Sequence, residues 1–345
     1  MKSPGDRRIT ISDIAEAAGV SIAGVSYALN GRKGVSDDTR QRVVRIAAEL
    51  GWSPTSAARS LAGADTETIG LVLARDPRVL GVESYYMQFL FGVETVLAEK
   101  DYGLLLQVVS SADDDIATLT KWRSSRRVDG VLLVDVGADD PRVELSQRPG
   151  ALPAVVVGDP SVAGPLASVW TDDAASMTEA VDYLAGLGHR SITRVTGFSG
   201  FAYTAIRDDA FSTAMATRGL RADIVRTDYT PEAGAQATRQ ALTGASPATA
   251  LIFDNDVMAV AALGIAAELG LSVPRDLSVI AWDDSPLCEY VYPKLTALSH
   301  DVMAFGAHAA GRLLDLIEGA EPAAHQDATP RLRVRSSTGP APARA

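Results

Sequence analysis

The residues of this chain best suited to chemistry are polar side chains that directly follow short apolar runs. They are Arg75-Asp76, Asp135, Asp159, Asp254-Asn255-Asp256 and Asp283-Asp284. Carboxylate and amide oxygens accept hydrogen bonds from hydroxyl groups, and an arginine donates through a planar fork. Such a set predicts the binding of a small polar ligand. Aspartate is also a routine turn and helix-capping residue, so each position taken alone could have only that role.

Motifs typical of enzymes and metal sites do not occur in the sequence. We find no Gly-rich phosphate loop of either common pattern, no nucleophile elbow and no zinc-ligand spacing. The one cysteine, Cys288, has no partner for an internal disulfide. We therefore expect no enzymatic activity, no cofactor and no bound metal.

Length and charge indicate a multidomain globular protein with a distinct N-terminal segment. The 345 residues suffice for two or three domains, and no apolar run approaches the ~18 residues of a membrane span. The N-terminus lacks a secretory signal, so we predict a cytoplasmic protein without a membrane partner. Residues 1–64 hold 9 Lys/Arg and 6 Asp/Glu, whereas the whole chain has a net charge of −11. A modestly basic segment on an acidic body favours a polyanion-binding module, although many small domains carry a similar charge.

Continuous apolar runs predict the strands that position the polar residues. The runs are 69–74, 102–109, 130–136, 152–159, 191–197, 223–229, 249–254 and 277–284. Continuous apolarity is typical of strands buried on both faces, and hence of parallel sheets covered by helices. The two series predict two α/β lobes, whose ligands bind beyond the carboxyl ends of the strands.

The first 54 residues predict three short helices. Gly19 ends the first helix, Ser21 caps the second, and Ser36 caps the third. Ala15, Gly19 and Val25 are spaced as a helix-turn-helix requires, with a small residue at the crossing, glycine in the turn and an aliphatic anchor. A small helical bundle without DNA-binding activity could show the same spacing by chance.

A much longer match narrows this choice. The stretches ITISDIAEAAGVSIAGVSYALNG and VSDDTRQRVVRIAAELGWSPTSAARSLA closely resemble the headpiece and hinge of the LacI/GalR family of bacterial repressors. The stretches TDDAASMTEAVDYLAGLGHRSITRVTG and FDNDVMAVAALGIAAELGLSVPRDLSVIAWDD are similar to the effector domain of the same family. The resemblance covers nearly the whole chain. It implies an all-α helix-turn-helix headpiece joined to a two-lobed, doubly wound α/β domain of the periplasmic-binding-protein type.

The resemblance also implies a division of the chain. We expect a DNA-binding headpiece at 1–54, a hinge helix or linker at 55–65, an effector-binding and dimerisation domain at 66–338, and a tail at 339–345. The first lobe is expected at about 66–165 and 296–325, and the second at about 166–295 and 326–338. The tail has no leucine heptads, which argues against a coiled-coil tetramer and favours a homodimer on a palindromic operator in double-stranded DNA.

The DNA contacts follow from the same family. The helix that opens at Ser21 would lie in the major groove. Ile22, Ala23 and Tyr27 match base-reading positions, whereas Ser21, Ser26, Asn30 and Arg32 are candidates for phosphate contacts. In the hinge, Arg59 and Leu61 would contact DNA, with Leu61 as a wedge in the minor groove. Leu61 could instead be an ordinary linker residue. Tyr27 stands where many relatives have Arg, so their operator sequence does not transfer.

The effector site is implied residue by residue. Arg207 matches the family's ligand-binding Arg, Asn255 the Asn of its ND motif, and Asp283 the Asp after the last strand. Trp282, Tyr86 and Phe201 could supply apolar faces for a ring or belong to the core.

Together these features predict a transcriptional repressor controlled by a small molecule. The acidic and aromatic strand-end residues predict a sugar, with a purine or nucleoside as the alternative. A solute-binding receptor would share the two-lobed body, but the headpiece and the missing signal argue against it. Inducer and corepressor members share one fold, so the direction of control stays open.

The wedge assignment is testable. Leu61→Ala is expected to weaken specific operator binding and to leave non-specific, salt-sensitive binding largely intact, because a wedge acts only at the kinked central step. Fluorescence anisotropy with an operator duplex and a random duplex measures both affinities. An equal loss on both duplexes would show that Leu61 supports stability instead.

Overall fold

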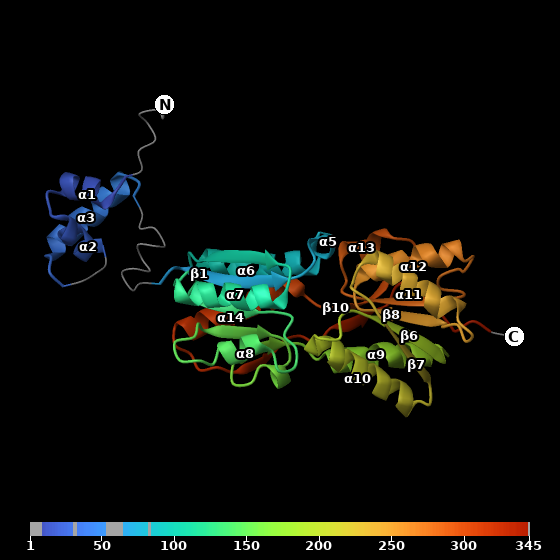
Figure 1. The fold of residues 1–345 in the computed structure, drawn as a ribbon. Helices are drawn as coiled ribbons and strands as arrows, with labels where there is room; N and C mark the ends of the chain where they lie inside the picture. The colour runs from blue at the N-terminus through green and yellow to red at the C-terminus, as the bar shows by residue number, and fades with distance from the viewer. Residues whose placement is uncertain (1–8, 30–32, 53–64, 82–83, 344–345) are drawn as a thin grey trace. The chain divides into compact units, whose positions relative to one another are not determined.

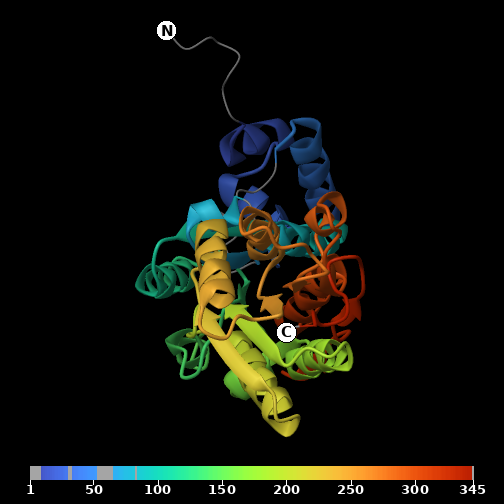
Figure 2. The same ribbon diagram turned by 90° about the vertical axis from the view of Figure 1, so that its right-hand side faces the viewer.

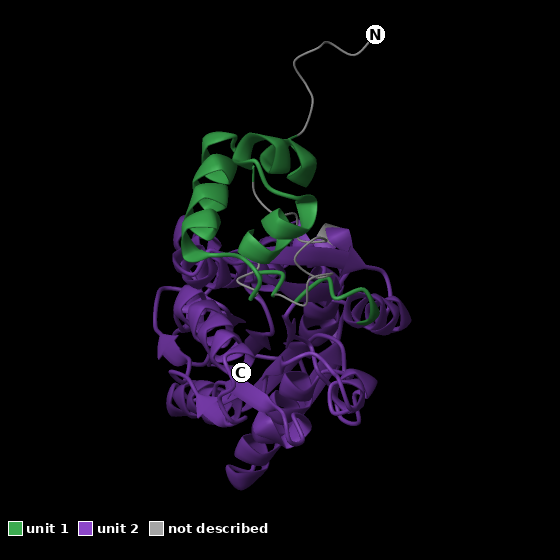
Figure 3. Ribbon diagram, turned by 90° about the vertical axis from the view of Figure 1, so that its left-hand side faces the viewer, with its two compact units in different colours: residues 1–67, 124–128 green, residues 68–123, 129–345 purple. Residues whose placement is uncertain are grey.

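The computed structural model describes residues 9–29, 33–52, 65–81 and 84–343 (Figure 1). The chain divides into two compact units, one formed by residues 1–67 with 124–128 and the other by 68–123 with 129–345 (Figure 3). Four of the predicted DNA contacts, Asn30, Arg32, Arg59 and Leu61, lie outside the described residues.

The headpiece consists of three helices with the predicted caps. They are α1 (Ile11–Ala18), α2 (Ile22–Leu29) and α3 (Asp37–Glu49). Gly19 ends α1 in the left-handed conformation, with φ of 66°. The Ser21 hydroxyl accepts a hydrogen bond from the Gly24 N–H, and the Ser36 hydroxyl accepts one from the Thr39 N–H. The predictions of these three helix ends are confirmed.

The first lobe is a six-stranded parallel sheet in the order β11-β5-β4-β3-β1-β2. Its strands are β1 (Thr68–Ala74), β2 (Gly103–Val109), β3 (Gly130–Leu133), β4 (Ala154–Val157), β5 (Ala167–Trp170) and β11 (Ala324–Gln326). The intervening helices are α5 (Pro77–Leu80), α6 (Tyr85–Glu99), α7 (Ala112–Ser124), α8 (Pro141–Leu145) and the 3₁₀ turn η1 (Pro160–Val162). Helix α14 (Val302–Ile317), from the C-terminal part of the chain, packs on β3, β4 and β5. The prediction that the run 102–109 is buried on both faces is wrong. Because β2 is an edge strand, its Leu106 and Val108 side chains are exposed.

The second lobe is a six-stranded sheet in the order β12-β10-β9-β8-β6-β7. Its strands are β6 (Ser191–Thr196), β7 (Arg221–Arg226), β8 (Ala250–Phe253), β9 (Ser278–Trp282), β10 (Thr296–Ser299) and β12 (Arg331–Arg333), of which only the β10–β12 pair among the described strands is antiparallel. Its helices are α9 (Asp173–Gly186), α10 (Ala202–Thr217), α11 (Pro231–Thr243), α12 (Asp256–Glu268) and α13 (Pro286–Tyr290).

Helices cover both faces of this second sheet (Figures 1 and 2). Successive residues of β8 alternate between the faces. Leu251 and Phe253 pack in a cluster with Met258 of α12, whereas Ile252 packs in a cluster with Phe211 of α10. This arrangement explains the continuous apolar runs in the sequence, because both faces of each central strand are buried.

The chain crosses between the lobes three times, after β5, after β10 and between β11 and β12. The first two crossings differ from the predicted boundaries at 166 and 296. Strand β5 (167–170) pairs with β4 in the first lobe, and β10 (296–299) pairs with β9 in the second. The sequences of β5 and β10, ASVW and TALS, contain serine or threonine, so these strands lack the continuous apolar run that marked the equally short strands β3, β4 and β8.

Helices α6 and α14 pack closely, and this packing is testable. A Cβ atom at Gly306 would lie 2.2 Å from the Phe89 carbonyl oxygen, whereas one at Gly311 on the same helix would meet open space. Gly306→Ala is expected to lower the free energy of unfolding by about 2 kcal/mol or more through overpacking. Gly311→Ala, as the control, is expected to raise it by up to ~1 kcal/mol. Urea denaturation measures both, and equal effects would contradict the close approach.

Candidate functional site

A pocket lies between the two lobes, where the carboxyl ends of both sets of strands meet. The empty space between its walls is about 890 Å³, a volume that includes open solvent at its mouth. Its lining residues are Arg75, Tyr85, Tyr86, Phe89, Val134, Asp135, Val157, Gly158, Asp159, Trp170, Thr171, Asp173, Tyr203, Ile206, Arg207, Tyr229, Asp254, Trp282, Asp283, His300 and Phe305. This is the place at which ligands of parallel sheets bind.

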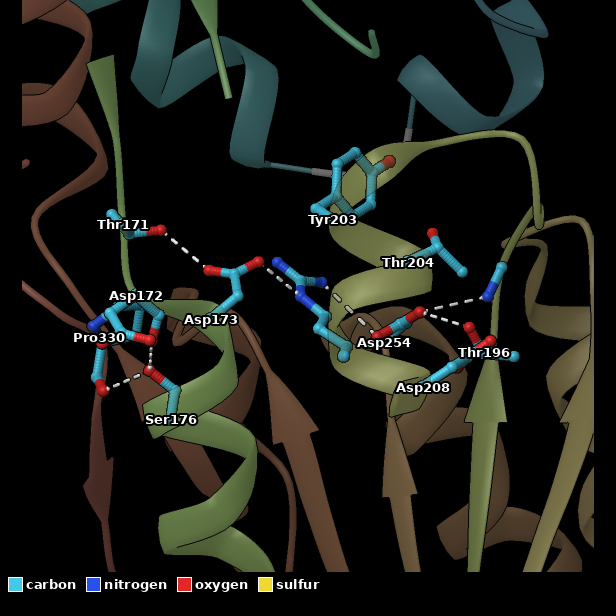
Figure 4. A network of polar contacts seen from close by, with 12 residues as sticks. Thr171, Asp172, Asp173, Ser176, Thr196, Tyr203, Thr204, Asp208, Asp254 and Pro330 are labelled. Carbon is cyan, nitrogen blue, oxygen red and sulfur yellow. Dashed lines mark hydrogen bonds and ion pairs between the residues drawn. The ribbon is translucent and has the colours of Figure 1, made fainter. Parts of the chain in front are cut away.

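Arg207, on α10, lines the pocket and is held by the carboxylates of Asp173 and Asp254. Figure 4 shows these two aspartates within a network of polar contacts. Arg207 Nε donates to Asp173 Oδ2 at 2.7 Å, and its Nη1 lies 3.4 Å from Asp254 Oδ1. The guanidinium carbon lies 3.5 Å from the ring centroid of Trp282. Burial alone would lower the pKa of Arg207, but Asp173 and Asp254 outweigh it and raise that pKa. Arg207 is therefore a permanently charged and firmly oriented group.

Arg194, fully buried on β6, fixes Asp254 from behind the pocket. Its Nη1 and Nη2 donate to the two oxygens of Asp254 at 2.8 and 3.0 Å, and the Thr196 hydroxyl donates to the same carboxylate at 2.7 Å. Burial alone would raise the pKa of Asp254, but Arg194 and Arg207 lower it, so the carboxylate stays ionised. A chain of ion pairs thus runs from the core of the second lobe to the pocket wall.

Arg75, at the end of β1, joins the two lobes. Its Nε and Nη2 donate to the two oxygens of Asp135 at 2.7 and 2.8 Å. The same Nη2 donates at 2.8 Å to the hydroxyl of Tyr203, which belongs to the second lobe. The guanidinium carbon also lies 4.8 Å from the Phe201 ring centroid and 5.0 Å from that of Tyr229, within the range of cation–π attraction. These contacts hold the lobes together in the observed conformation.

Two polar groups of the pocket are uncharged at neutral pH. Burial lowers the pKa of His300 and raises the pKa of Tyr85. His300 Nδ1 and Arg75 Nη1 are buried nitrogen atoms for which the described part of the chain provides no hydrogen-bond partner. Both residues line the pocket, so a ligand oxygen or hydroxyl could complete their hydrogen bonding.

The structure brings together four of the six predicted effector residues. Arg207, Asp283, Trp282 and Tyr86 line the pocket. The Trp282 side chain is 1% exposed and stacks with Arg207, so that face of its ring meets an arginine rather than a ligand.

Asn255 and Phe201 are not among the lining residues. The Asn255 side chain accepts from the Met258 N–H as the cap of α12 and donates to the Tyr229 carbonyl oxygen, so its amide is used within the second lobe. Phe201 packs against the Arg75 guanidinium instead of facing the pocket. The predicted direct ligand contact is replaced, at both positions, by a contact that supports the pocket wall.

Sequence reasoning missed several lining residues, among them Asp173, Tyr229 and His300. Asp172 caps α9 by accepting from the Ala175 N–H, and its neighbour Asp173 pairs with Arg207. Tyr229 and His300 follow strand ends, so the rule applied to the aspartates could have found them had it been extended to aromatic and histidine side chains.

The predicted base-reading residues form the exposed side of α2. Ile22 is 57% exposed and Tyr27 41%, and Ala23 and Ser21 are exposed as well. Ser26 is half-buried. The surface is apolar and hydroxyl-bearing, which suits thymine methyl groups and phosphate oxygens in a major groove about 12 Å wide.

The described residues also bear on membrane and metal binding. Within residues 9–343, apart from the undescribed gaps, no helix is both long and apolar enough to cross a membrane. The same described ranges hold no group of three or more His, Cys, Asp or Glu side chains that could bind a metal ion.

Comparison with known proteins adds an independent result. Residues 10–55 match the family "Bacterial regulatory proteins, lacI family", and residues 181–338 match "Periplasmic binding protein-like domain". The HTH-type transcriptional regulator AglR of Rhizobium meliloti is 32% identical, over 97% of this chain and 96% of its own. The HTH-type transcriptional repressor PurR of Haemophilus influenzae is 28% identical, over 95% and 98%.

A solved structure, a complex of the transcriptional regulator CelR with cellobiose, shares this fold. Its TM-score is 0.73 at 28% identity, and the match covers 96% of this chain and all of the other. The similarity therefore includes both the headpiece and the two-lobed body.

The hydrogen bond from Arg75 to Tyr203, which joins the two lobes, yields a prediction. Tyr203→Phe removes the hydroxyl that accepts from Arg75, which should weaken the closed arrangement by about 1–2 kcal/mol. Small-angle X-ray scattering of the ligand-free protein is expected to show a larger mean radius of gyration. Tyr183→Phe is the control, because the Tyr183 hydroxyl bonds Thr338 without contacting Arg75. A radius unchanged in both variants would contradict a closing role for Tyr203.

Proposed function

Because this chain belongs to the LacI family of bacterial regulatory proteins, we propose that it is a DNA-binding transcriptional repressor whose operator affinity is controlled by a sugar bound between its lobes. The observation that carries this proposal is the pocket at the strand ends, polar and aromatic, with contacts from both lobes. A ligand in that position would change how the lobes meet. Because the DNA-binding headpiece is on the same chain, this change would alter the affinity for DNA.

The headpiece supports the DNA-binding half of the proposal. Ile22, Ala23 and Tyr27 would contact base edges, and Ser21 and Ser26 would contact phosphates together with Asn30 and Arg32. The Ser21 hydroxyl accepts the Gly24 N–H, and its own O–H can still donate to a phosphate oxygen. Since Ile22 and Ala23 offer only apolar contact, thymine methyl groups are the base features that suit them.

Two copies of the chain would act on one operator. A helix-turn-helix dimer places its recognition helices on half-sites about one helical turn apart, which matches a palindromic operator. The segment at 55–65, with Arg59 and Leu61, would meet its partner copy over the operator centre. Ligand binding would alter the spacing of these paired segments and change DNA affinity through a coupling of a few kcal/mol.

The ligand site would use the residues that line the pocket. Arg207 would donate to ligand oxygens, and Asp283 would accept from ligand hydroxyls. Tyr86 and Trp282 would shape the wall, and Asn255 and Phe201 would support it from behind. We propose further that the ligand is bound without being transformed, and that the protein acts in the cytoplasm at the nucleoid.

A purine or nucleoside is the second candidate ligand. The specific observations in its favour are the 28% identity to PurR and the aromatic rings of the pocket wall. A sugar is preferred because the wall carries five carboxylates, which accept hydrogen bonds from hydroxyl groups. The cellobiose bound by the related CelR is in keeping with this preference.

Selection of bound sequences from a random DNA pool tests the proposal. Full-length protein, without and with mixtures of sugars or purines, is expected to recover a palindrome whose central step is easily kinked. A sugar mixture is expected to change the yield of that palindrome. Enrichment of no sequence under any of the three conditions would contradict the DNA-binding function. A response to purines alone would contradict the sugar assignment.

A further inference from the structure

The charges of the pocket wall are unbalanced. Five aspartates line it against two arginines and no lysine. The aspartates are Asp135, Asp159, Asp173, Asp254 and Asp283. Arg194 lies directly behind Asp254, but it also binds Asp208, so it does not balance the excess of carboxylates in the wall.

Both arginines of the wall are already ion-paired. Arg75 binds Asp135 through two hydrogen bonds, and its side chain is 5% exposed. Arg207 lies between Asp173 and Asp254. An anionic ligand that displaced either guanidinium from its carboxylates would leave a buried carboxylate without its partner, and breaking a buried pair in this way is strongly unfavourable.

His300 does not supply the missing positive charge. Burial is the largest influence and lowers the pKa of its imidazole. Of the nearby charged groups, Arg207 lowers this pKa further, whereas Asp173 and, to a smaller extent, Asp327 and Asp301 raise it. The net direction is downward, so the ring is neutral at neutral pH. The excess of negative charge in the wall therefore persists under physiological conditions.

The hydrogen-bonding groups of the wall point to the same chemistry. Asp135, Asp173 and Asp254 already accept hydrogen bonds from arginines. Ionised carboxylates only accept, so any further hydrogen bond to the carboxylates of the wall requires a donor on the ligand. Arg75 Nη1 is a buried donor that lacks a partner in the described structure, so it needs an acceptor. A hydroxyl group both donates and accepts, and a polyhydroxyl compound therefore satisfies both requirements. A phosphate or carboxylate only accepts, and it adds negative charge beside the aspartates.

We propose that the ligand is an uncharged or amino-bearing polyhydroxyl compound, and that the wall rejects phosphorylated and acidic sugars through its paired arginines and excess aspartates. This inference rests on the proposed sugar-controlled function and specifies the charge class of the ligand. The selectivity comes from electrostatics rather than from size, because the anionic counterparts differ from neutral sugars by a single small group.

Matched sugars test the proposal on the full-length protein. The probes are glucose, galactose, cellobiose and maltose, each with its phosphorylated, acidic and amino counterpart, measured by isothermal titration calorimetry. The neutral sugar that binds best is expected to bind at least about tenfold more tightly than its phosphorylated and acidic counterparts, a difference of roughly 1.4 kcal/mol. Its amino counterpart is expected to bind within about threefold of it or more tightly.

Anionic counterparts that bind as tightly as the neutral sugars would overturn the proposal. So would the failure of every neutral and every amino probe at millimolar concentration. Operator binding, measured in parallel by anisotropy, separates this failure from failure of the proposed function. If an acidic or phosphorylated sugar shifts operator affinity, the repressor function stands and only the charge class is wrong. If no operator is bound under any condition, the function itself fails.

A pair of variants isolates the role of the wall charge. Asp159 lines the pocket and accepts from the Ser161 N–H two residues on. Asp228 accepts in the same way from the Thr230 N–H but is exposed and outside the lining set. Asparagine keeps such a turn or cap at little cost in stability.

Asp159→Asn is expected to narrow the preference for the neutral sugar over its anionic counterpart by about threefold, and Asp228→Asn to leave that ratio unchanged. Thermal denaturation confirms that both variants are folded. An unchanged ratio in Asp159→Asn, or an equal change in both variants, would overturn the electrostatic explanation.

Discussion

The placement of the Arg75 guanidinium is the constraint on which the ligand site depends. An arginine at the end of a buried strand requires a carboxylate, and Asp135 supplies it from the neighbouring strand end. The remaining surface of the guanidinium faces Tyr203, Phe201 and Tyr229 of the second lobe. If the lobes separate, these contacts are exchanged for water. Lobe closure and the state of one buried cation are therefore linked, and a ligand that enters between them acts on both.

The buried ion pairs of the second lobe are explained by orientation rather than by stability. Replacing such pairs with apolar groups of similar volume is often neutral or stabilising, so their energy alone does not account for them. Arg194 binds both oxygens of Asp254 and thereby fixes the carboxylate that faces Arg207. With Asp173 on its other side, Arg207 has one accessible orientation against Trp282. If the proposed ligand binds Arg207, it meets a preformed donor at little further entropic cost.

Much of this architecture could be predicted from the sequence, for physical reasons that differ by element. The central strands could be predicted because both of their faces are buried, which makes their sequences continuously apolar. The helix ends at Gly19, Ser21 and Ser36 could be predicted because a cap depends only on residues within a few positions of the helix end. The strands β5 and β10 could not, because their sequences, ASVW and TALS, contain serine or threonine, whereas the equally short β3, β4 and β8 are wholly apolar. Arg207 and Asp283 came from family resemblance, whereas the supporting role of Asn255 depends on a contact with the distant Tyr229. No local pattern encodes such a contact.

The proposed function requires that ligand binding between the lobes and DNA binding by the headpiece are coupled. Coupling is reciprocal, so the factor by which a ligand changes operator affinity must equal the factor by which the operator changes ligand affinity. The most direct test is calorimetric titration of the best-binding neutral sugar into free protein and into the protein–operator complex. We expect two different ligand affinities, whose ratio equals the ratio of operator affinities without and with the sugar. The same ligand affinity in both titrations would contradict the coupling.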